Sequence, residues 1–282
     1  MTVRRLSAGL VAAALFTPGL AACNSSGTSS AGSTASPTVS ASGVPSPPGS
    51  PVAGDAKQAL LDSTREISNG NFRFTLAGVG STAEGQVHQP SQSASMKIAL
   101  GGPSSDLAMK LDVIHFKPDS WVKLELTGAT ADSLPAIKRL NLGKYQHLDQ
   151  TRIKGNRSLG FDFEKVDPAG SAVLTQGITE VRSTGTGTYA GTIDVSRAAE
   201  AGSLNAATIA ALGTQAKTVP FTAKVDPQGR LSELVLQLPA AGQTAAQEIR
   251  MTYSDYGAAT AAQKPPANQV VEAPAELYSL FN

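Results

Sequence analysis

The stretch Val219-Pro220-Phe221-Thr222-Ala223-Lys224-Val225, followed by Asp226-Pro227-Gln228-Gly229 and by Leu231 to Leu238, decides the fold. Its first part alternates apolar and polar side chains with a period of two, which is typical of a strand with one buried face. The residues from Asp226 to Gly229 are those that a type I turn prefers at each position. Because the returning segment is again rich in apolar residues, the stretch predicts an antiparallel hairpin.

The same period-two alternation recurs upstream, which extends the prediction from one hairpin to a sheet. The expected strands cover residues 71–76, 81–89, 93–100, 106–116 and 120–126. Turn sequences such as Gly101-Gly102-Pro103 and Lys117-Pro118-Asp119 separate them. Short alternating strands joined by turns every eight to twelve residues favour an antiparallel meander over crossover units.

The remaining segments complete the sheet and add helices. Further strands are expected at residues 144–149, at 248–257 and as a pair within 181–195 that is joined near Gly185 to Gly187. A helix is expected from the N-cap Asp55 to Asn69-Gly70, a helical turn around Pro135, a helix over 167–176 with Pro168 at its first position, and an Ala-rich helix over 204–212. The tail after residue 257 is expected to be irregular.

About ten strands and three or four short helices place the chain in the α+β class. An antiparallel sheet of this many strands tends to curl. We therefore expect a single curved antiparallel sheet, a half-open β-barrel of about ten strands, with short helices on its concave side.

The N-terminus carries a second informative stretch, Leu20-Ala21-Ala22-Cys23, which contains the only cysteine. Upstream lie Arg4-Arg5, a short apolar region from Leu6 to Phe16 and Pro18-Gly19, an order typical of a signal peptide. Small residues before a single cysteine indicate a lipoprotein signal, in which residues 1–22 are removed and Cys23 is joined to diacylglycerol by a thioether. The alternatives are a secretory signal with an incidental cysteine, and a membrane anchor, for which this apolar region is shorter than the roughly 20 residues needed. The export route, general secretory or twin-arginine, stays open.

Residues 24–54 separate this cysteine from the foldable part. They are mainly Ser, Thr, Gly, Pro and Ala, without charges or aromatic rings. Such a composition does not bury enough apolar surface to fold, and as a flexible coil it spans about 30 Å. We therefore expect a lipidated and disordered segment at 23–54 and one folded domain at 55–282, held outside the cytoplasm at the cell membrane.

Charge and cysteine content exclude several classes of function. The chain has 23 basic side chains, of which the signal removes Arg4 and Arg5, against 22 acidic ones, so the mature chain has a net charge of −1. A chain with this net charge lacks the excess of basic residues that nucleic-acid binding requires. With Cys23 acylated no disulfide can form, so the fold rests on its apolar core. The oligomeric state is not evident from the sequence.

No catalytic signature occurs in the chain. The G-x-S-x-G, H-E-x-x-H and G-x-x-x-x-G-K-[ST] motifs are absent, and the glycine-rich stretch from Gly185 to Gly191 has one residue too many for G-x-G-x-x-G. His88, His115 and His147 are isolated in sequence, which favours surface or edge histidines over a metal site. We expect no enzyme activity, no cofactor and no metal.

The strand pattern supplies one set of candidate site residues, which share an apolar and adaptable character. Aliphatic and thioether side chains can line a pocket for acyl chains, which need volume more than directional bonds. The alternative is that the same residues fill the core. The candidate cavity-lining residues are Phe72, Phe74, Leu76, Met96, Ile98, Leu100, Met109, Leu111, Val113, Ile249 and Met251.

The order of lipoprotein signal, Ser/Pro linker, helix and meander resembles the actinobacterial LppX/LprG-type lipoproteins, which are similar to the periplasmic lipid carrier LolA. The resemblance covers Asp55 to Glu276 and is carried by Ser120-Trp121-Val122-Lys123-Leu124, Lys144-Tyr145-Gln146-His147-Leu148-Asp149, Asp167-Pro168-Ala169-Gly170, Tyr189-Ala190-Gly191-Thr192-Ile193-Asp194 and Met251-Thr252-Tyr253-Ser254-Asp255-Tyr256-Gly257.

The resemblance implies a half-open barrel that encloses a lipid-accepting cavity and moves lipids or lipidated molecules between membranes. The partners expected are thus the membrane, through Cys23, and a lipid or lipidated ligand. The alternative function is a non-catalytic surface binding or accessory lipoprotein with a filled core, whose partner is a protein or the cell wall. Native mass spectrometry and a structure of the interior would distinguish the two.

Overall fold

The computed structural model describes residues 53–78, 80–101, 106–128, 139–156, 159–199, 204–242 and 244–281, all within one compact unit, Gly49–Asn282. The predicted signal peptide, Cys23 and nearly all of the predicted linker lie outside the described residues. So does most of the helical turn expected around Pro135.

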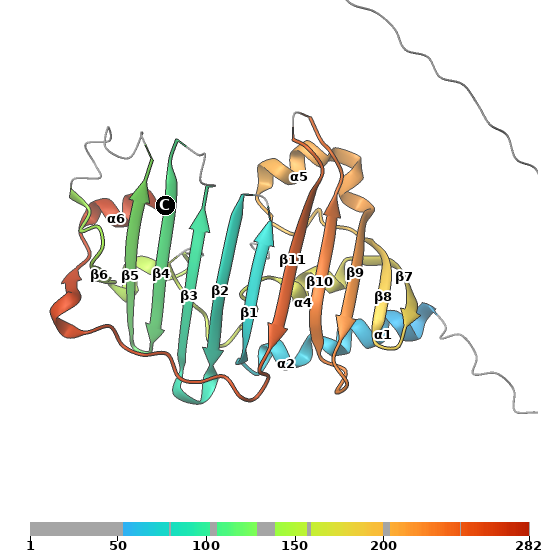
Figure 1. Cartoon of the computed structure of the whole chain (residues 1–282), viewed down its shortest axis with the longest axis horizontal. Helices are drawn as coiled ribbons and strands as arrows, with labels where there is room; N and C mark the ends of the chain where they lie inside the picture. The colour runs from blue at the N-terminus through green and yellow to red at the C-terminus, as the bar shows by residue number, and fades with distance from the viewer. Residues whose placement is uncertain are drawn as a thin grey trace, which may run out of the picture. The chain divides into compact units, whose positions relative to one another are not determined.

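One large sheet organises the described part of the chain (Figure 1). It has twelve strands, where the sequence predicts about ten, in the order β12-β6-β5-β4-β3-β2-β1-β11-β10-β9-β8-β7. The strands are β1 (Asn71–Gly78), β2 (Ser81–His88), β3 (Ser93–Leu100), β4 (Ala108–Phe116), β5 (Asp119–Thr127), β6 (Tyr145–His147), β7 (Ile178–Gly185), β8 (Thr188–Ile193), β9 (Val219–Val225), β10 (Leu231–Leu238), β11 (Gln247–Ser254) and β12 (Val270–Glu272). The sheet is curved and open, with β12 and β7 at its ends.

The pairing confirms the antiparallel meander and adds one exception. Strands β1 to β5 lie side by side in chain order and pair antiparallel. The chain then returns so that β11 pairs with β1, with Phe74 opposite Tyr253 and Leu76 opposite Met251. Only β12 and β6 are parallel among the described pairs. A strand as short as β12 has too few residues to show a period of two, which explains why the sequence predicts an irregular tail there.

The hairpin of β9 and β10 is confirmed. Phe221 lies opposite Leu236 and Val225 opposite Leu231. The Asp226 carboxylate accepts hydrogen bonds from the backbone N–H groups of Gln228 (3.0 Å) and Arg230 (2.9 Å), and Gly229 has φ +79°, which favours glycine. Local turn chemistry therefore fixes this pair of strands.

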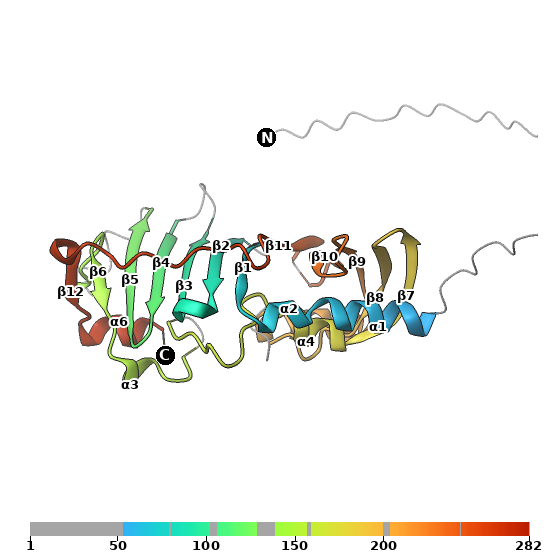
Figure 2. The same ribbon diagram turned by 90° about the horizontal axis from the view of Figure 1, so that it is seen from below.

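Short helices cover one face of the sheet (Figure 2). Helices α1, α2 and α4 lie against the half formed by β7–β11, and α3 and α6 lie against β4–β6. Helix α5 and the 3₁₀ helix η4 lie at one end of β9–β11 (Figure 1). Their bounds are α1 (Ala53–Ser63), α2 (Arg65–Ser68), α3 (Gln150–Ile153), α4 (Ser171–Gln176), α5 (Ala206–Leu212) and α6 (Ala275–Leu280), with 3₁₀ helices η1 (Gln89–Ser91), η4 (Gly213–Lys217) and η5 (Ala267–Gln269).

Two of the expected helices have other boundaries in the structure. The first helix begins at Ala53, so that Asp55 lies in its first turn, and it breaks at Thr64. Ser63 and Thr64 donate side-chain hydrogen bonds to the carbonyls of Leu60 and Leu61, which compete with regular helix geometry.

The expected helix over 167–176 begins only at Ser171. Pro168 therefore lies before the helix and not at its first position. The Asp167 carboxylate accepts hydrogen bonds from the backbone N–H groups of Ser171 and Ala172, both at 2.9 Å, and these bonds hold the start of the helix at Ser171.

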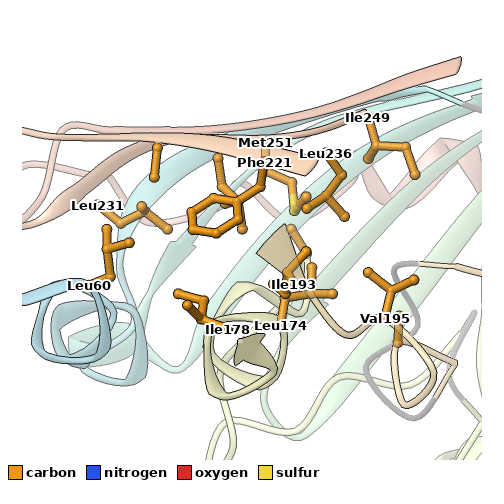
Figure 3. Close-up of a cluster of buried hydrophobic side chains, with 14 of the residues drawn as sticks. Leu60, Leu174, Ile178, Ile193, Val195, Phe221, Leu231, Leu236, Ile249 and Met251 are labelled. Atoms are coloured by element: carbon orange, nitrogen blue, oxygen red, sulfur yellow. The ribbon is translucent and has the colours of Figure 1, made fainter. Parts of the chain in front are cut away.

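Two apolar cores pack under the helix-covered face. The first core fills the β7–β11 half and includes Leu60, Leu174, Phe221, Leu236 and Met251 (Figure 3). The second core lies under α3 and α6, and its buried residues are Leu111, Val113, Val122, Leu124, Leu140, Leu148, Ile153, Leu159, Leu277 and Tyr278. Each fully buried side chain of this size contributes about 1.5–3 kcal/mol, so the two cores carry the stability of the fold.

The two faces of the sheet differ in chemistry. On the face turned away from the helices, which we call the bare face, Thr75, Glu84, Lys97, Asp112 and Lys123 follow one another across β1–β5. Apart from Gly85, their neighbours along each strand carry apolar side chains that point to the helix-covered face. The period-two pattern thus gives this face a row of charged and hydroxyl side chains, while close to the turn between β4 and β5 the same face carries a small apolar cluster of Ile114, Trp121 and Ala262.

Candidate functional site

An apolar hollow opens on the helix-covered side at the end of β3, β4 and β5, next to α6. Its volume is about 680 Å³, within the range of ligand pockets. Among the described residues, six of its lining side chains are large and apolar. The lining residues are Leu100, Gly101, Leu107, Met109, Leu126, Leu140, Ala275, Glu276, Ser279 and Leu280.

Strand register builds one wall of the hollow. Leu100, Met109 and Leu126 lie opposite one another on β3, β4 and β5, so their side chains form one row on the helix-covered face. The row continues the second core, against which Met109 and Leu126 pack with part of their surface exposed. The hollow is therefore an unfilled extension of a packed core.

Helix α6 builds the opposite wall, and contacts on the side away from the hollow hold it in place. Leu277 and Tyr278 are buried in the second core. The Tyr278 hydroxyl accepts a hydrogen bond from the backbone N–H of Asp149 at 2.8 Å, and the Arg152 guanidinium lies 3.7 Å from the centre of the Tyr278 ring. These contacts leave Ala275, Glu276, Ser279 and Leu280 to line the hollow.

Leucines at the hollow remain open to solvent. In the described part of the chain the exposed large apolar residues are Leu107 (39%), Leu142 (38%) and Leu280 (50%). Leu107 and Leu280 line the hollow, and Leu142 lies two residues after the lining residue Leu140. Clustered exposed apolar surface typically marks a binding site, because isolated exposure is common but grouped exposure is not.

The polar groups that the described residues contribute to the hollow are already paired. The Glu276 carboxylate accepts a hydrogen bond from Arg139 Nη1 at 3.3 Å. Its own backbone N–H and Arg139 hold the Glu276 pKa below its usual range. The Ser279 hydroxyl donates to the Ala275 carbonyl at 3.3 Å. With these groups engaged, the hollow offers volume and apolar surface to a ligand.

The structure brings the eleven candidate cavity residues onto one face of the sheet, but not into one cavity. Leu100 and Met109 line the hollow. Leu76, Met96 and Ile98 are half-buried between the two cores. The structure places six within the packed cores: Phe72, Phe74, Leu111, Val113, Ile249 and Met251.

Sequence reasoning missed the rest of the hollow. Leu107 and Leu126 fit the strand pattern but stand at strand ends, and Leu140 lies in a segment without periodicity. The sequence analysis predicts an irregular tail where α6 lies, although Leu277, Leu280 and Phe281 have the spacing of a helix face. That spacing is the signal that would have found the second wall.

The bare face has two grooves of a different kind. Their volumes are about 490 and 400 Å³. Four charged or hydroxyl side chains line both grooves: Thr75, Glu84, Lys97 and Asp112. Opposite charges lie side by side there, with Lys97 Nζ 4.0 Å from a Glu84 oxygen, and both side chains are exposed, so water screens this pair.

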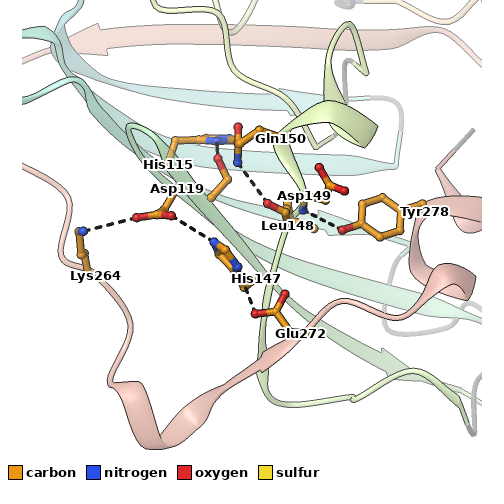
Figure 4. A network of polar contacts seen from close by, with 10 residues as sticks. His115, Asp119, His147, Leu148, Asp149, Gln150, Lys264, Glu272 and Tyr278 are labelled. Carbon is orange, nitrogen blue, oxygen red and sulfur yellow. Dashed lines mark hydrogen bonds and ion pairs between the residues drawn. The ribbon is translucent and has the colours of Figure 1, made fainter.

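The histidines are less isolated than their sequence spacing indicates. His147 lies between two carboxylates, with Nε2 3.2 Å from Asp119 and Nδ1 3.3 Å from Glu272, and Lys264 lies 3.7 Å from Asp119 (Figure 4). His115, expected at the surface or an edge, is buried, and its Nδ1 is hydrogen-bonded to Ser120 Oγ at 2.8 Å. Across the described residues no group of His, Cys, Asp and Glu has the arrangement of a metal site.

Burial of His115 predicts a pH-dependent loss of stability. Burial lowers the pKa of His115 from 6.5 to about 4, so the unfolded chain binds a proton that the folded chain rejects. The stability that His115 contributes is therefore present above pH 6.5 and is lost as the pH falls towards 4. The full loss is about 3 kcal/mol.

Chemical denaturation of the wild type and His115→Gln over pH 4–7 would check this loss. The free-energy difference between the two proteins is the quantity to compare, because burial raises the pKa of Asp167 to about 6 and its titration acts in the opposite direction over the same range. A pH-independent difference would contradict the assignment.

One buried side chain stands outside both the site and these networks. Gln146 on β6 is fully buried, and its amide oxygen and nitrogen have no hydrogen-bond partner among the described residues. An unpaired buried amide destabilises a fold by about 1–3 kcal/mol. Gln146 does not line the hollow, so it adds no polar group there.

Comparison with known proteins does not assign the chain to a family. No protein-family model matches the sequence, and no curated protein matches it. Among the described residues no helix is long and apolar enough to cross a bilayer.

Proposed function

We propose that this protein is a lipoprotein, anchored by Cys23 to the extracytoplasmic face of the cell membrane, that binds lipids or lipidated molecules and transfers them across the cell envelope. The acyl chains of the ligand occupy the apolar hollow between β3–β5 and α6. Binding follows from burial of apolar surface, and the protein is a carrier that performs no chemistry on its ligand.

The hollow is the observation that carries this proposal. The hollow has a volume of about 680 Å³, and two of the leucines that line it, Leu107 and Leu280, are 39% and 50% exposed. Leaving such surface in water is unfavourable, and burying an acyl chain against it is worth about 0.8 kcal/mol per methylene group. An apolar ligand of extended shape suits these walls better than a polar one, since the carboxylate and hydroxyl are already paired.

The sequence supports the same function independently. A lipoprotein signal places the domain at a membrane, and the linker from 24 to 54 lets it move away from the surface. The resemblance to LppX/LprG-type lipoproteins and LolA supports a half-open barrel with its helices on the concave side. In this proposal the open curved sheet is that barrel.

A non-catalytic surface or accessory lipoprotein is the second candidate, and the packed cores favour it. Six of the eleven expected cavity residues fill those cores, so most of the interior is occupied. In that case the exposed leucines would contact a protein or the cell wall.

Chain-length dependence distinguishes the two candidates. The full chain carrying Cys23→Ser would be titrated with a fluorescent fatty acid, which saturated fatty acids of increasing length then displace. For a carrier, we expect affinity to rise about fourfold per added methylene until the hollow is full. Displacement that is independent of chain length, or no probe binding, would favour the second candidate.

A further inference from the structure

The last strand of the sheet, β7, has a free edge. Strand β8 pairs with one side of it, and no described strand pairs with the other. A groove of about 520 Å³ lies between this edge and α1, lined by Gly54, Lys57, Gln58, Leu61, Thr179, Glu180 and Val181. Helix α1 packs along β7, and Lys57 Nζ donates to the Ile178 carbonyl at 2.6 Å, so the start of the strand is covered and the groove lies beside Thr179 to Val181. The edge therefore offers backbone groups to another strand.

Two charges on this edge lack partners. Glu180 and Arg182 are both exposed on the bare face, and neither forms an ion pair with another described residue. Their neighbours on β8 are Thr192 and Ala190, which carry no charge. Elsewhere on this face, Glu233 pairs with two basic residues from adjoining strands. The strand thus presents one negative and one positive charge, two residues apart on the same face.

We propose that this edge binds β7 of a second copy of the chain, in an antiparallel pair with its two-fold axis at Val181. Residues directly opposite each other in a sheet point to the same face, so a two-fold pair that continues the sheet is centred on a residue. Centring on Glu180 or Arg182 would place like charges opposite each other. Centring on Val181 places Glu180 of each copy opposite Arg182 of the other, which gives two ion pairs.

The proposed contact between the two β7 strands involves few residues, so we expect the dimer to be weak. Register shifts beside Ile178 and Ser183 confine the regular part of β7 to Glu180–Ser183. Such an interface is smaller than the 1,200–2,000 Å² of stable complexes, so the dimer forms reversibly at high protein concentration. Because the same patch serves both copies, assembly stops at two.

Charge reversal tests the pairing directly. Sedimentation velocity would be measured over a concentration series on the full chain carrying Cys23→Ser, so that acyl chains do not drive association. We expect a monomer–dimer equilibrium, at least tenfold weaker association for Glu180→Arg or Arg182→Glu alone, and recovery in Glu180→Arg/Arg182→Glu. Lys110→Glu, an exposed charge reversal on β4 away from the edge, is the matched control and should leave association unchanged.

Three results would overturn the proposal: a monomer at every concentration, association unaffected by either single reversal, or no recovery in the double variant. Circular dichroism would confirm that the exposed substitutions leave the fold intact. The proposal does not depend on lipid binding, so its failure would leave the proposed function untouched.

Discussion

Replacing Met109 by tryptophan should weaken binding of a fluorescent palmitate analogue at least tenfold. Met109 stands in the middle of the row Leu100, Met109 and Leu126, and its half-buried side chain faces the hollow. An indole ring in that position takes up space that the acyl chain would occupy. A tenfold loss corresponds to about 1.4 kcal/mol, the burial of about two methylene groups.

The matched control is Lys110→Trp, the same substitution on the next residue of β4, whose exposed side chain points to the bare face. It should leave the affinity within about twofold of the wild type, since surface changes of this kind are worth about 0.5 kcal/mol or less. Thermal unfolding of both variants would show that the fold is retained. Equal affinities for Met109→Trp and Lys110→Trp would place the ligand elsewhere.

Truncating Phe221 to alanine should lower the free energy of unfolding by about 3–5 kcal/mol. Phe221 is 2% exposed in the middle of β9 and packs in the first core (Figure 3). Neighbours on both strands and helices prevent the site from collapsing, so the change leaves a cavity. Total stability of a domain is only about 5–15 kcal/mol, which makes this one of the largest effects that a single substitution can have.

Phe116→Ala is the matched control for Phe221→Ala. Phe116 is half-buried at the end of β4, with Lys264 Nζ 4.8 Å from its ring centre, and should lose clearly less stability. Urea unfolding would measure both. Below its melting temperature Phe221→Ala should still bind the palmitate analogue with wild-type affinity, because the first core lies outside the hollow. Similar losses for both variants would contradict the assignment of Phe221 to a tightly packed core.

Local chemistry made much of the sheet predictable. The alternation in Val219–Val225, the turn from Asp226 to Gly229 and the meander of β1–β5 all depend on residues close together in the chain. In each case the period-two alternation marks the strands, and the turn between two of them makes them neighbours in the sheet. Such features need no knowledge of the rest of the fold.

Contacts between distant segments were not predictable in the same way. The pairing of β1 with β11 joins Phe74 to Tyr253, and β12 pairs with β6 although it has only three residues. Neither pairing leaves a local pattern. The helix break at Thr64 likewise depends on side-chain hydrogen bonds that propensity alone does not reveal.

The candidate site combines both situations. Leu100 and Met109 were predictable because they belong to a strand face, whereas the hollow itself depends on where α6 packs. Its position is determined by Tyr278 against Asp149 and Arg152, residues more than 120 positions away. Sequence periodicity found the apolar face, and tertiary packing decided which part of that face stayed unfilled.

Native mass spectrometry of the full chain carrying Cys23→Ser, purified from its own host without detergent, tests the central claim most directly. We expect a mass above that of the polypeptide by one lipid, released at higher collision energy, and a reduced fraction of this species in Met109→Trp. A spectrum of bare polypeptide for the wild type, under conditions that preserve a known lipid complex, would contradict the account.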